Sequence, residues 1–420
     1  MKVLMHRIMI VAMLACSVSA ADKVKAPELI RLSKAAPAVF REALVATLGQ
    51  AEIQKGIAVI GENGDFLWAV ENGKQPELYI DDAAVVKLTR LDGDLWFHAG
   101  KVVTGRSFNF HYIVDGAKFG GRTDIPAFGP DSYDQPGVPK GTLSEKLTHT
   151  SQMYEGMTSD YWIYVPAQYD PNVPAALMVW HDGQRLVPRE EPARLQIAID
   201  NLIHQKKIPV MIQVFTAPGM VGTRAMRATQ YDTMSDKFAR YLRDELLPEV
   251  YKKYNIRKDG YSRGIAGYSS GGISSFTVAW FQPDQFTRVL AQIPSLVSIG
   301  WTPGGTNEGG NMYPFKVRRE PKRNIRVYVQ DGINDGEQQW GSWPLQAIQF
   351  ANGLKLRGYD FKLSYGTGTH NDNDGRAKVP EQLTWLWRGY DPAKTEQVYE
   401  MDAEEKAKPL FRVKIFNRDF

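Results

Sequence analysis

The sequence predicts an α/β domain with a mostly parallel sheet, preceded by a small all-β sandwich domain. Beyond residue 150, short apolar runs alternate with helical stretches, which is typical of a parallel sheet that has helices on both faces. Before that point, runs of alternating apolar and polar residues lie between Asp-Gly and Gly breaks, which indicates antiparallel strands. A length of 420 residues also favours two domains over one.

The first 20 residues have the pattern of a secretory signal peptide. Lys2 and Arg7 precede an apolar run from Ile8 to Ala15, and Val18 and Ala20 stand before a predicted cleavage site after Ala20. We therefore expect a secreted or periplasmic protein, because this run is too short to span a bilayer. Cys16 is the single cysteine of the sequence, so a lipoprotein anchored through Cys16 is the alternative. A disulfide framework and a thiolate metal cage are both excluded.

Residues 50–124 are predicted to form the β-sandwich, after a helical stretch at Val39–Leu48. Trp68, Trp96 and Phe97 are either an exposed platform for glycan or the core of this domain, and the core is the commoner role of such residues. The predicted strands are FLWAV (66–70), ELYI (77–80), VVKLTRL (85–91), LWFHAGKV (95–102) and RSFNFHYIVDG (106–116).

Residues 125–149 are predicted as a linker, because they are rich in proline and glycine and have no periodicity; packing of this stretch on the domain that follows is the alternative. The α/β domain is then expected over 150–392, with an amphipathic helical stretch at 232–254. Its predicted strands are YWIYV (161–165), ALMVW (176–180), VMIQVF (210–215), GIAG (264–267), IRVYVQ (325–330) and FKLSYG (361–366).

The charge and composition exclude several classes of partner. The formal net charge is +4, of which the predicted signal peptide contributes two charges, and this near-neutral balance gives no indication of nucleic-acid binding. No later apolar run is long enough for a transmembrane helix. Oligomeric state cannot be derived from these features.

The stretch AGYSSGG at 266–272 contains a candidate nucleophile. Ser269 has Gly267 two residues before it and Gly271 two residues after it, which gives the G-x-S-x-G pattern of a nucleophile elbow between a strand and a helix. A side chain at either glycine would collide with the neighbouring strand or helix in this tight turn. The pattern predicts an α/β-hydrolase fold, with the backbone N–H of Ser270 as one oxyanion-hole donor.

The order of residues in that fold gives the other catalytic candidates, because the acid and then the histidine follow the serine along the chain. His370 is the only one of the seven histidines after Ser269. Asp331, Asp335 and Glu337 follow the strand-like run IRVYVQ and are the candidate acids. Asp331 directly precedes a glycine, where a carboxylate commonly binds its own turn, but the three alternatives stay open.

The stretch HDGQ at 181–184 is the candidate source of the second oxyanion-hole donor, because it follows an early predicted strand. Gly183 and Gln184 are expected at the tip of this turn and supply the candidate N–H groups. His181 and Asp182 are expected to shape the loop, since Asp-Gly is first a turn signal.

The region from Ser159 to Arg388 resembles the esterase D family of serine esterases, which includes enterochelin esterases and the feruloyl and acetyl esterases attached to xylan-degrading enzymes. The resemblance implies that Asp335 is the acid, and that Tyr268 and Arg227 are candidates for the substrate pocket. Gln230 departs from the family pattern, in which many members have Glu. The N-terminal domain is similar to the immunoglobulin-like early-set domains that precede such esterases. The matching stretches are WHDGQ, RATQYD, DELLPEV, RGIAGYSSGGISSFTVAWFQPDQF, IRVYVQDGIND, GTGTHNDNDG and LTWLW.

These features together predict a serine carboxylic ester hydrolase that forms an acyl-enzyme and needs no metal and no organic cofactor. The expected substrates are small-molecule or polysaccharide esters, above all feruloyl or acetyl groups on carbohydrate. One alternative is a periplasmic siderophore esterase acting on a trilactone, for which Arg224, Arg227 and the basic run at 316–323 could bind the anionic complex. An alternative of another class is a glycan-binding protein with an inert hydrolase domain. An acyltransferase with the same intermediate also stays open.

Overall fold

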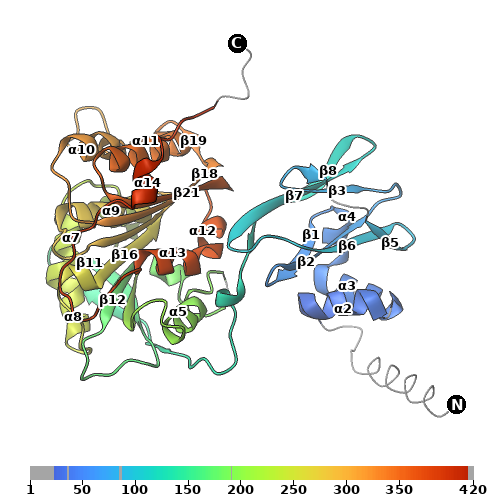
Figure 1. The fold of residues 1–420 in the computed structure, drawn as a ribbon, viewed down its shortest axis with the longest axis horizontal. Helices are drawn as coiled ribbons and strands as arrows, with labels where there is room; N and C mark the ends of the chain where they lie inside the picture. The colour runs from blue at the N-terminus through green and yellow to red at the C-terminus, as the bar shows by residue number, and fades with distance from the viewer. Residues whose placement is uncertain (1–22, 36, 85–87, 191, 415–420) are drawn as a thin grey trace. The chain divides into compact units, whose positions relative to one another are not determined.

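The computed structural model describes residues 23–414 except 36, 85–87 and 191. Within this part of the chain, contacts divide the protein into two compact units, and the boundary lies between Pro130 and Asp131 (Figure 1). The predicted signal peptide and Cys16 lie outside the described residues, so both stay predictions. Among the described residues, no helix has the length and apolar character needed to cross a membrane.

The N-terminal unit contains two four-stranded antiparallel sheets, of order β1-β2-β6-β5 and β4-β3-β7-β8. Three helices precede them: α2 (Ala26–Ala35), α3 (Pro37–Leu48) and α4 (Gln50–Gln54). The strands are β1 (Ala58–Glu62), β2 (Asp65–Glu71), β3 (Glu77–Ile80), β4 (Ala83–Ala84), β5 (Thr89–Asp92), β6 (Leu95–Lys101), β7 (Arg106–Val114) and β8 (Ala117–Ala127). Part of the predicted strand at 85–91 lies outside the described residues.

The first of these sheets is buried on both faces. Trp68 and Trp96 pack with residues of the second sheet, so the two sheets enclose a common core. On the opposite face, Leu67 and Phe97 pack against the helices that precede the sheet. Trp68, Trp96 and Phe97 are only 0%, 9% and 8% exposed. The suggested glycan platform is therefore wrong for these aromatic residues, which form the core instead.

The segment 125–149 differs from the predicted linker, because most of it belongs to one unit or the other. Its first residues complete β8, and a 3₁₀ turn follows at Pro130–Ser132. The side chain of Asn201 donates hydrogen bonds to the backbone carbonyls of Asp131 and Tyr133, which fixes this stretch to the C-terminal unit. Two short strands, β9 (Thr142–Leu143) and β10 (Leu147–Thr150), then pair with the large sheet.

The C-terminal unit is built on one large, mostly parallel sheet of order β15-β14-β11-β13-β12-β16-β17-β18-β21. Strands β13, β12, β16, β17, β18 and β21 are parallel to one another, whereas β11 is antiparallel to β13. The bounds are β11 (Met157–Val165), β12 (Ala176–His181), β13 (Met211–Thr216), β14 (Met220–Val221), β15 (Arg224–Ala225), β16 (Arg263–Tyr268), β17 (Arg288–Gln292), β18 (Arg326–Asn334) and β21 (Asp360–Thr369), with a separate hairpin of β19 (Glu337–Gln338) and β20 (Gly341–Ser342).

Side chains of the central strands alternate between two cores, because successive residues of a strand point to opposite faces. Leu177 and Val179 of β12 pack with α7 to α11 on one face, whereas Met178 and Trp180 pack with α5 and α13 on the other. Figure 1 shows α10 and α11 on one side of the strands and α5 and α13 on the opposite side. The helices are α5 (Leu195–His204), α6 (Arg227–Tyr231), α7 (Lys237–Tyr241), α8 (Leu247–Tyr251), α9 (Ser270–Phe281), α10 (Tyr313–Arg319), α11 (Trp343–Leu356), α12 (Asn373–Ala377), α13 (Val379–Leu386) and α14 (Ala403–Ala407).

The helical stretch predicted over 232–254 is present as α7 and α8, joined by a π-helical turn at Leu242–Leu246. The unit also extends beyond the predicted end at residue 392. Tyr399 is 1% exposed and hydrogen-bonded to Thr287, and the backbone N–H of Phe411 donates to the side chain of Asn352. The mostly parallel sheet with helices on both faces agrees with the predicted α/β-hydrolase fold.

Candidate active site

The candidate site residues meet at the carboxyl ends of the parallel strands, where ligands bind in open α/β sheets. Asp182 directly follows β12, Ser269 directly follows β16, and Asp335 directly follows β18. His370 directly follows β21. Four residues that are far apart in the sequence are thus brought to one edge of the sheet by the topology.

Ser269 has the strained backbone of a nucleophile elbow, with φ of 55° and ψ of −124°. A Cβ at Gly267 would lie 2.5 Å from backbone atoms of Gly271, and a Cβ at Gly271 would lie 3.1 Å from both the Asp182 carboxylate and the Cβ of His181. The two flanking glycines therefore let the chain turn sharply from β16 into α9. This turn presents the Ser269 hydroxyl at the edge of the sheet.

The three predicted catalytic side chains form a continuous hydrogen-bonded series. Ser269 Oγ lies 2.9 Å from His370 Nε2, and His370 Nδ1 lies 2.6 Å from Asp335 Oδ1. The His370 side chain is 30% exposed, whereas the Asp335 side chain is fully buried. This geometry lets the histidine accept the serine proton while the carboxylate fixes the histidine tautomer.

The three candidate acids lie in different surroundings. Asp335 contacts His370 and also accepts a hydrogen bond from the N–H of Gly336. Asp331 is still within β18, is fully buried, and accepts from the N–H of Gly332 at 2.7 Å. Glu337 is exposed on β19. Asp335 is thus the member of this set that contacts the histidine.

Two residues that the sequence analysis missed also contact the series. The Trp343 ring packs edge-on against His370 with ring centroids 4.9 Å apart, which limits the movement of the imidazole. Ser295 is buried, and its hydroxyl lies 3.3 Å from Ser269 Oγ. Neither residue belongs to a sequence pattern that would have indicated its place.

The predicted oxyanion-hole residues lie next to the serine. Ser270 is the first residue of α9, so its backbone N–H belongs to the unpaired first turn of that helix. Gly183 and Gln184 begin a short 3₁₀ turn after β12. Gly183 is buried rather than exposed at a loop tip as expected, because a Cβ there would lie 2.5 Å from the backbone of Phe215. Their role as donors stays a prediction.

A partly buried ion pair supports the loop beside the serine. Asp182 has a positive φ of 52° and is 2% exposed. Arg227 donates two hydrogen bonds to its carboxylate, each 2.8 Å long. This bidentate pair joins the loop after β12 to the start of α6, so Asp182 does shape the loop.

The cleft around Ser269 has a volume of about 380 Å³. Both predicted pocket residues, Tyr268 and Arg227, lie in it. The guanidinium of Arg185 packs 4.7 Å from the centre of the Tyr268 ring and also pairs with Asp372 at 3.2 Å. The lining residues are Asp182, Gln184, Arg185, Arg227, Tyr268, Ser269, Ile293 and His370.

His181 and Asp232 are buried titratable groups near the cleft. Burial, with a smaller contribution from the nearby Arg227, lowers the pKa of His181 to about 3, so this ring is neutral and packs on Tyr231 as a core residue. Burial raises the pKa of Asp232 to about 6, and the nearby Ser270 hydroxyl and Arg227 oppose this shift only in part. The Ser270 hydroxyl thus lies near a buried carboxyl group that no sequence pattern indicates.

Gln230 is not one of the residues that line this cleft. Its side chain is 2% exposed, and its amide oxygen accepts a hydrogen bond of 2.7 Å from the N–H of Gly219. The departure from the family pattern at this position therefore concerns the packing of the segment between β13 and α6.

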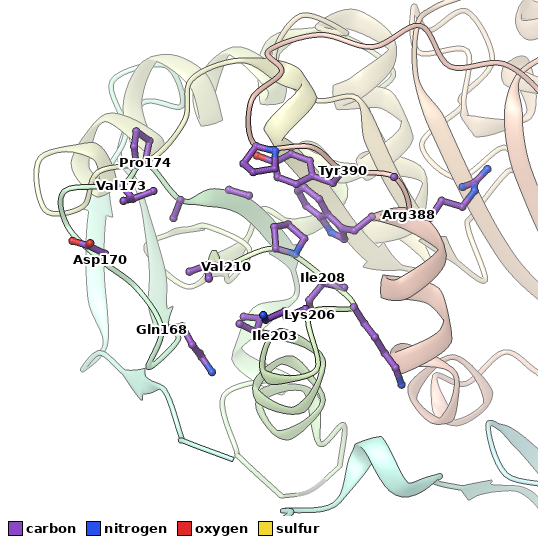
Figure 2. A pocket seen from close by; sticks show the side chains of 17 residues that line it. Gln168, Asp170, Val173, Pro174, Ile203, Lys206, Ile208, Val210, Arg388 and Tyr390 are labelled. Carbon is purple, nitrogen blue, oxygen red and sulfur yellow. The ribbon is translucent and has the colours of Figure 1, made fainter. Parts of the chain in front are cut away.

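A larger cavity of about 660 Å³ lies at the opposite edge of the sheet (Figure 2). Val173 and Pro174 precede β12, Val210 precedes β13, and Tyr390 follows α13, so this cavity is at the amino ends of the strands. The site residues are all at the carboxyl ends. Despite its size, this cavity is therefore not the candidate active site.

Comparison with known proteins identifies the family of the chain. A family model described as "Putative esterase" matches residues 156–376, which is more than half of the chain. The chain belongs to this esterase family. The matched region includes Ser269 and His370 and supports carboxylic ester hydrolysis by this esterase.

Individual relatives of this esterase are more distant. An endo-1,4-beta-xylanase/feruloyl esterase of Xylanibacter ruminicola is 27% identical over 180 residues, which cover 43% of this chain and 22% of that protein. The match thus spans about a fifth of the relative. The enterobactin esterase of Shigella flexneri, solved with enterobactin, has a TM-score of 0.51 at 16% identity and covers 78% of this chain and 97% of its own. A ferulic acid esterase of Anaeromyces mucronatus has a TM-score of 0.45 at 19% identity over 61% of this chain and 93% of its own.

Proposed function

We propose that this protein is a serine carboxylic ester hydrolase that works through an acyl-enzyme intermediate. The observation that carries the proposal is the hydrogen-bonded series of Ser269, His370 and Asp335. In this scheme Ser269 Oγ attacks the ester carbonyl while His370 Nε2 accepts its proton. The leaving alcohol then takes that proton, and a water molecule, activated in turn by His370, releases the acid from Ser269.

The charge of the cleft favours neutral esters over a highly anionic substrate. The two arginines that line it are each paired with a carboxylate, Arg227 with Asp182 and Arg185 with Asp372. The basic run at 316–323 is outside the cleft lining, and its Lys316 pairs with Glu308 and Glu320. A triply charged siderophore complex would need unpaired cations at the site. We therefore rank the siderophore esterase as the second candidate.

We propose esters on carbohydrate, such as feruloyl or acetyl groups, as the substrate class. The sequence similarity to a protein named as a xylanase and feruloyl esterase supports this choice. Export through the predicted signal peptide at residues 1–20 would bring the enzyme to polymeric esters. An inert domain that only binds glycan is disfavoured by the complete serine, histidine and acid series.

The test is hydrolysis of a panel consisting of p-nitrophenyl acetate, methyl ferulate, acetylated xylan and a catecholate trilactone, each with the parent enzyme and Ser269→Ala. We expect turnover of the carbohydrate-type esters by the parent and none above background by the variant. Preference for the trilactone by two orders of magnitude or more in kcat/KM would favour the siderophore alternative. No hydrolysis of any ester by the parent would refute the proposal.

A further inference from the structure

Asp331 and Asp335 form a buried pair of carboxyl groups directly behind His370. Their side chains are close enough to interact, because Asp335 is one of the groups that raise the pKa of Asp331. Both groups belong to one turn, because the N–H of Asp335 donates to the carbonyl of Gly332 at 3.1 Å. Two neighbouring carboxyl groups can be hydrogen-bonded to each other only when one of them carries a proton. The reaction scheme above uses Asp335 and leaves Asp331 without a role.

The Oδ2 atoms of both groups lack a hydrogen-bond donor in the part of the chain that the structure describes. Asp331 Oδ2 and Asp335 Oδ2 are both buried, and among the described residues no N–H or O–H group donates to either. The Oδ1 atoms are occupied, that of Asp335 by His370 and Gly336 and that of Asp331 by Gly332. A proton shared between the two Oδ2 atoms would satisfy both at once.

The surroundings decide which group keeps the proton. Asp335 accepts hydrogen bonds from two donors, one of them the histidine, whereas Asp331 accepts from the N–H of Gly332 alone among the described residues. Burial first, and then the adjacent Asp335, raise the pKa of Asp331 well above its ordinary value. Tyr365 of β21 lies opposite Asp331 in the sheet, and burial with the two aspartates raises its pKa to about 12, so it is neutral.

We propose that Asp331 is a neutral carboxylic acid that donates its proton to Asp335 Oδ2 and thereby positions the Asp335 carboxylate on His370. Because Asp335 is then held at both oxygens, its carboxylate cannot rotate away from the imidazole. One negative charge, rather than two, faces the histidine when it accepts the serine proton. This role of Asp331 rests on the reaction proposed above, whereas its protonation state does not.

The protonation state is tested without any substrate. The infrared spectrum of the parent at neutral pH should contain a carbonyl band of a protonated carboxyl group. This band should be absent from the spectrum of Asp331→Asn. The NMR titration of the His370 imidazole, assigned with His370→Gln, should have the same midpoint in the parent and in Asp331→Asn, because no charge is removed. A midpoint lower by about one pH unit or more in Asp331→Asn, as expected for the loss of a nearby carboxylate, would overturn the proposal.

The positioning role is tested with two variants of Asp331, one whose side chain can donate a hydrogen bond to Asp335 and one whose side chain cannot. Asp331→Asn keeps a neutral group that can donate to Asp335, so we expect kcat within about threefold of the parent. Asp331→Val has a similar volume but no donor, and should lose about tenfold in kcat with KM changed much less. Equal kcat in Asp331→Val and the parent would refute positioning. If Asp331→Val does not fold, as judged by circular dichroism, the band and titration in Asp331→Asn still decide the protonation state.

Discussion

Asp232 offers a test in which the sign and the size of the effect both follow from its surroundings. Its side chain is 4% exposed, and burial raises its pKa from 3.8 to about 6, a difference of 2.2. Between these two values the folded protein holds a proton that the unfolded chain has released. Asp232 therefore does not lower the free energy of unfolding below pH 3.8, and its cost grows as the pH rises from 3.8 to about 6. At 1.36 kcal/mol for each unit, the loss is about 3 kcal/mol above pH 6.

Asp232→Asn removes this cost, because an amide does not ionise. We expect the stabilisation by Asp232→Asn, measured as the free energy of unfolding relative to the parent, to be about 3 kcal/mol larger at pH 8 than at pH 4. Urea unfolding at the two pH values measures this difference, with the transition of the C-terminal unit analysed separately. Asp236→Asn is a matched control, because the side chain of Asp236 is 48% exposed. Its effect on the free energy of unfolding should differ by well under about 1 kcal/mol between the two pH values. Equal stabilisation by Asp232→Asn at both pH values would refute the reasoning.

Further expectations concern the serines, the acid and the domain boundary. Ser269→Ala should lose ester hydrolysis by several orders of magnitude without unfolding. Ser270→Ala should keep most of the turnover, because only the backbone N–H of Ser270 is assigned to the oxyanion hole, and the reverse pattern in activity would move the nucleophile. Asp335→Asn should lower kcat by a factor of roughly 10³ to 10⁴ with little change in KM. A kcat close to that of the parent would show that Asp335 is not the catalytic acid. Deleting residues 21–130 should leave p-nitrophenyl acetate hydrolysis intact. Deleting residues 21–140 should lower the melting temperature, because residues 131–134 are hydrogen-bonded to Asn201 of α5 and to Arg189 before it. Equal melting temperatures of the two deletion variants would refute this.

The sequence was most informative where local chemistry leaves few alternatives. The G-x-S-x-G pattern predicted the elbow because a Cβ at Gly267 would lie 2.5 Å from backbone atoms, and a Cβ at Gly271 would be crowded at 3.1 Å. The chain order of the fold then left His370 as the sole candidate, and it lies beside Ser269. Apolar runs located the central strands because a parallel sheet with two covered faces needs continuous apolar segments.

The sequence was least informative where tertiary contacts override composition. The proline-rich stretch after residue 125 suggested a linker, but the amide of Asn201 and the edge of the large sheet hold it to the C-terminal unit. Aromatic residues such as Trp68 have the same sequence pattern whether they face solvent or a second sheet. The Ser270 hydroxyl of α9 lies near Asp232 of the segment after α6, and no local pattern indicates this proximity.

The choice between Asp331 and Asp335 illustrates a limit of turn chemistry. We expected Asp331 to accept a hydrogen bond from the N–H of the glycine that follows it, and it does. Asp335 likewise accepts from the N–H of Gly336, the glycine that follows it. The property that separates them is the end of β18 at Asn334. Asp331 is still paired with β21, whereas Asp335 lies beyond the last pair and faces the loop that contains His370.

The close approach of β18 and β21 should therefore control the distance between the acid and the histidine. A Cβ at Gly332 would lie 2.3 Å from the carbonyl oxygen of Gly368, so Gly332→Ala must push the two strands apart just before His370. We expect Gly332→Ala to lower kcat at least tenfold, with a smaller change in KM, because a misplacement of about 1 Å costs about 10²-fold. Gly366→Ala is the matched control, since Gly366 pairs with Gly332 and a Cβ there would meet only the Lys378 ammonium at 3.9 Å. Equal kcat in the two variants would show that the strand spacing does not set the contact between His370 and Asp335.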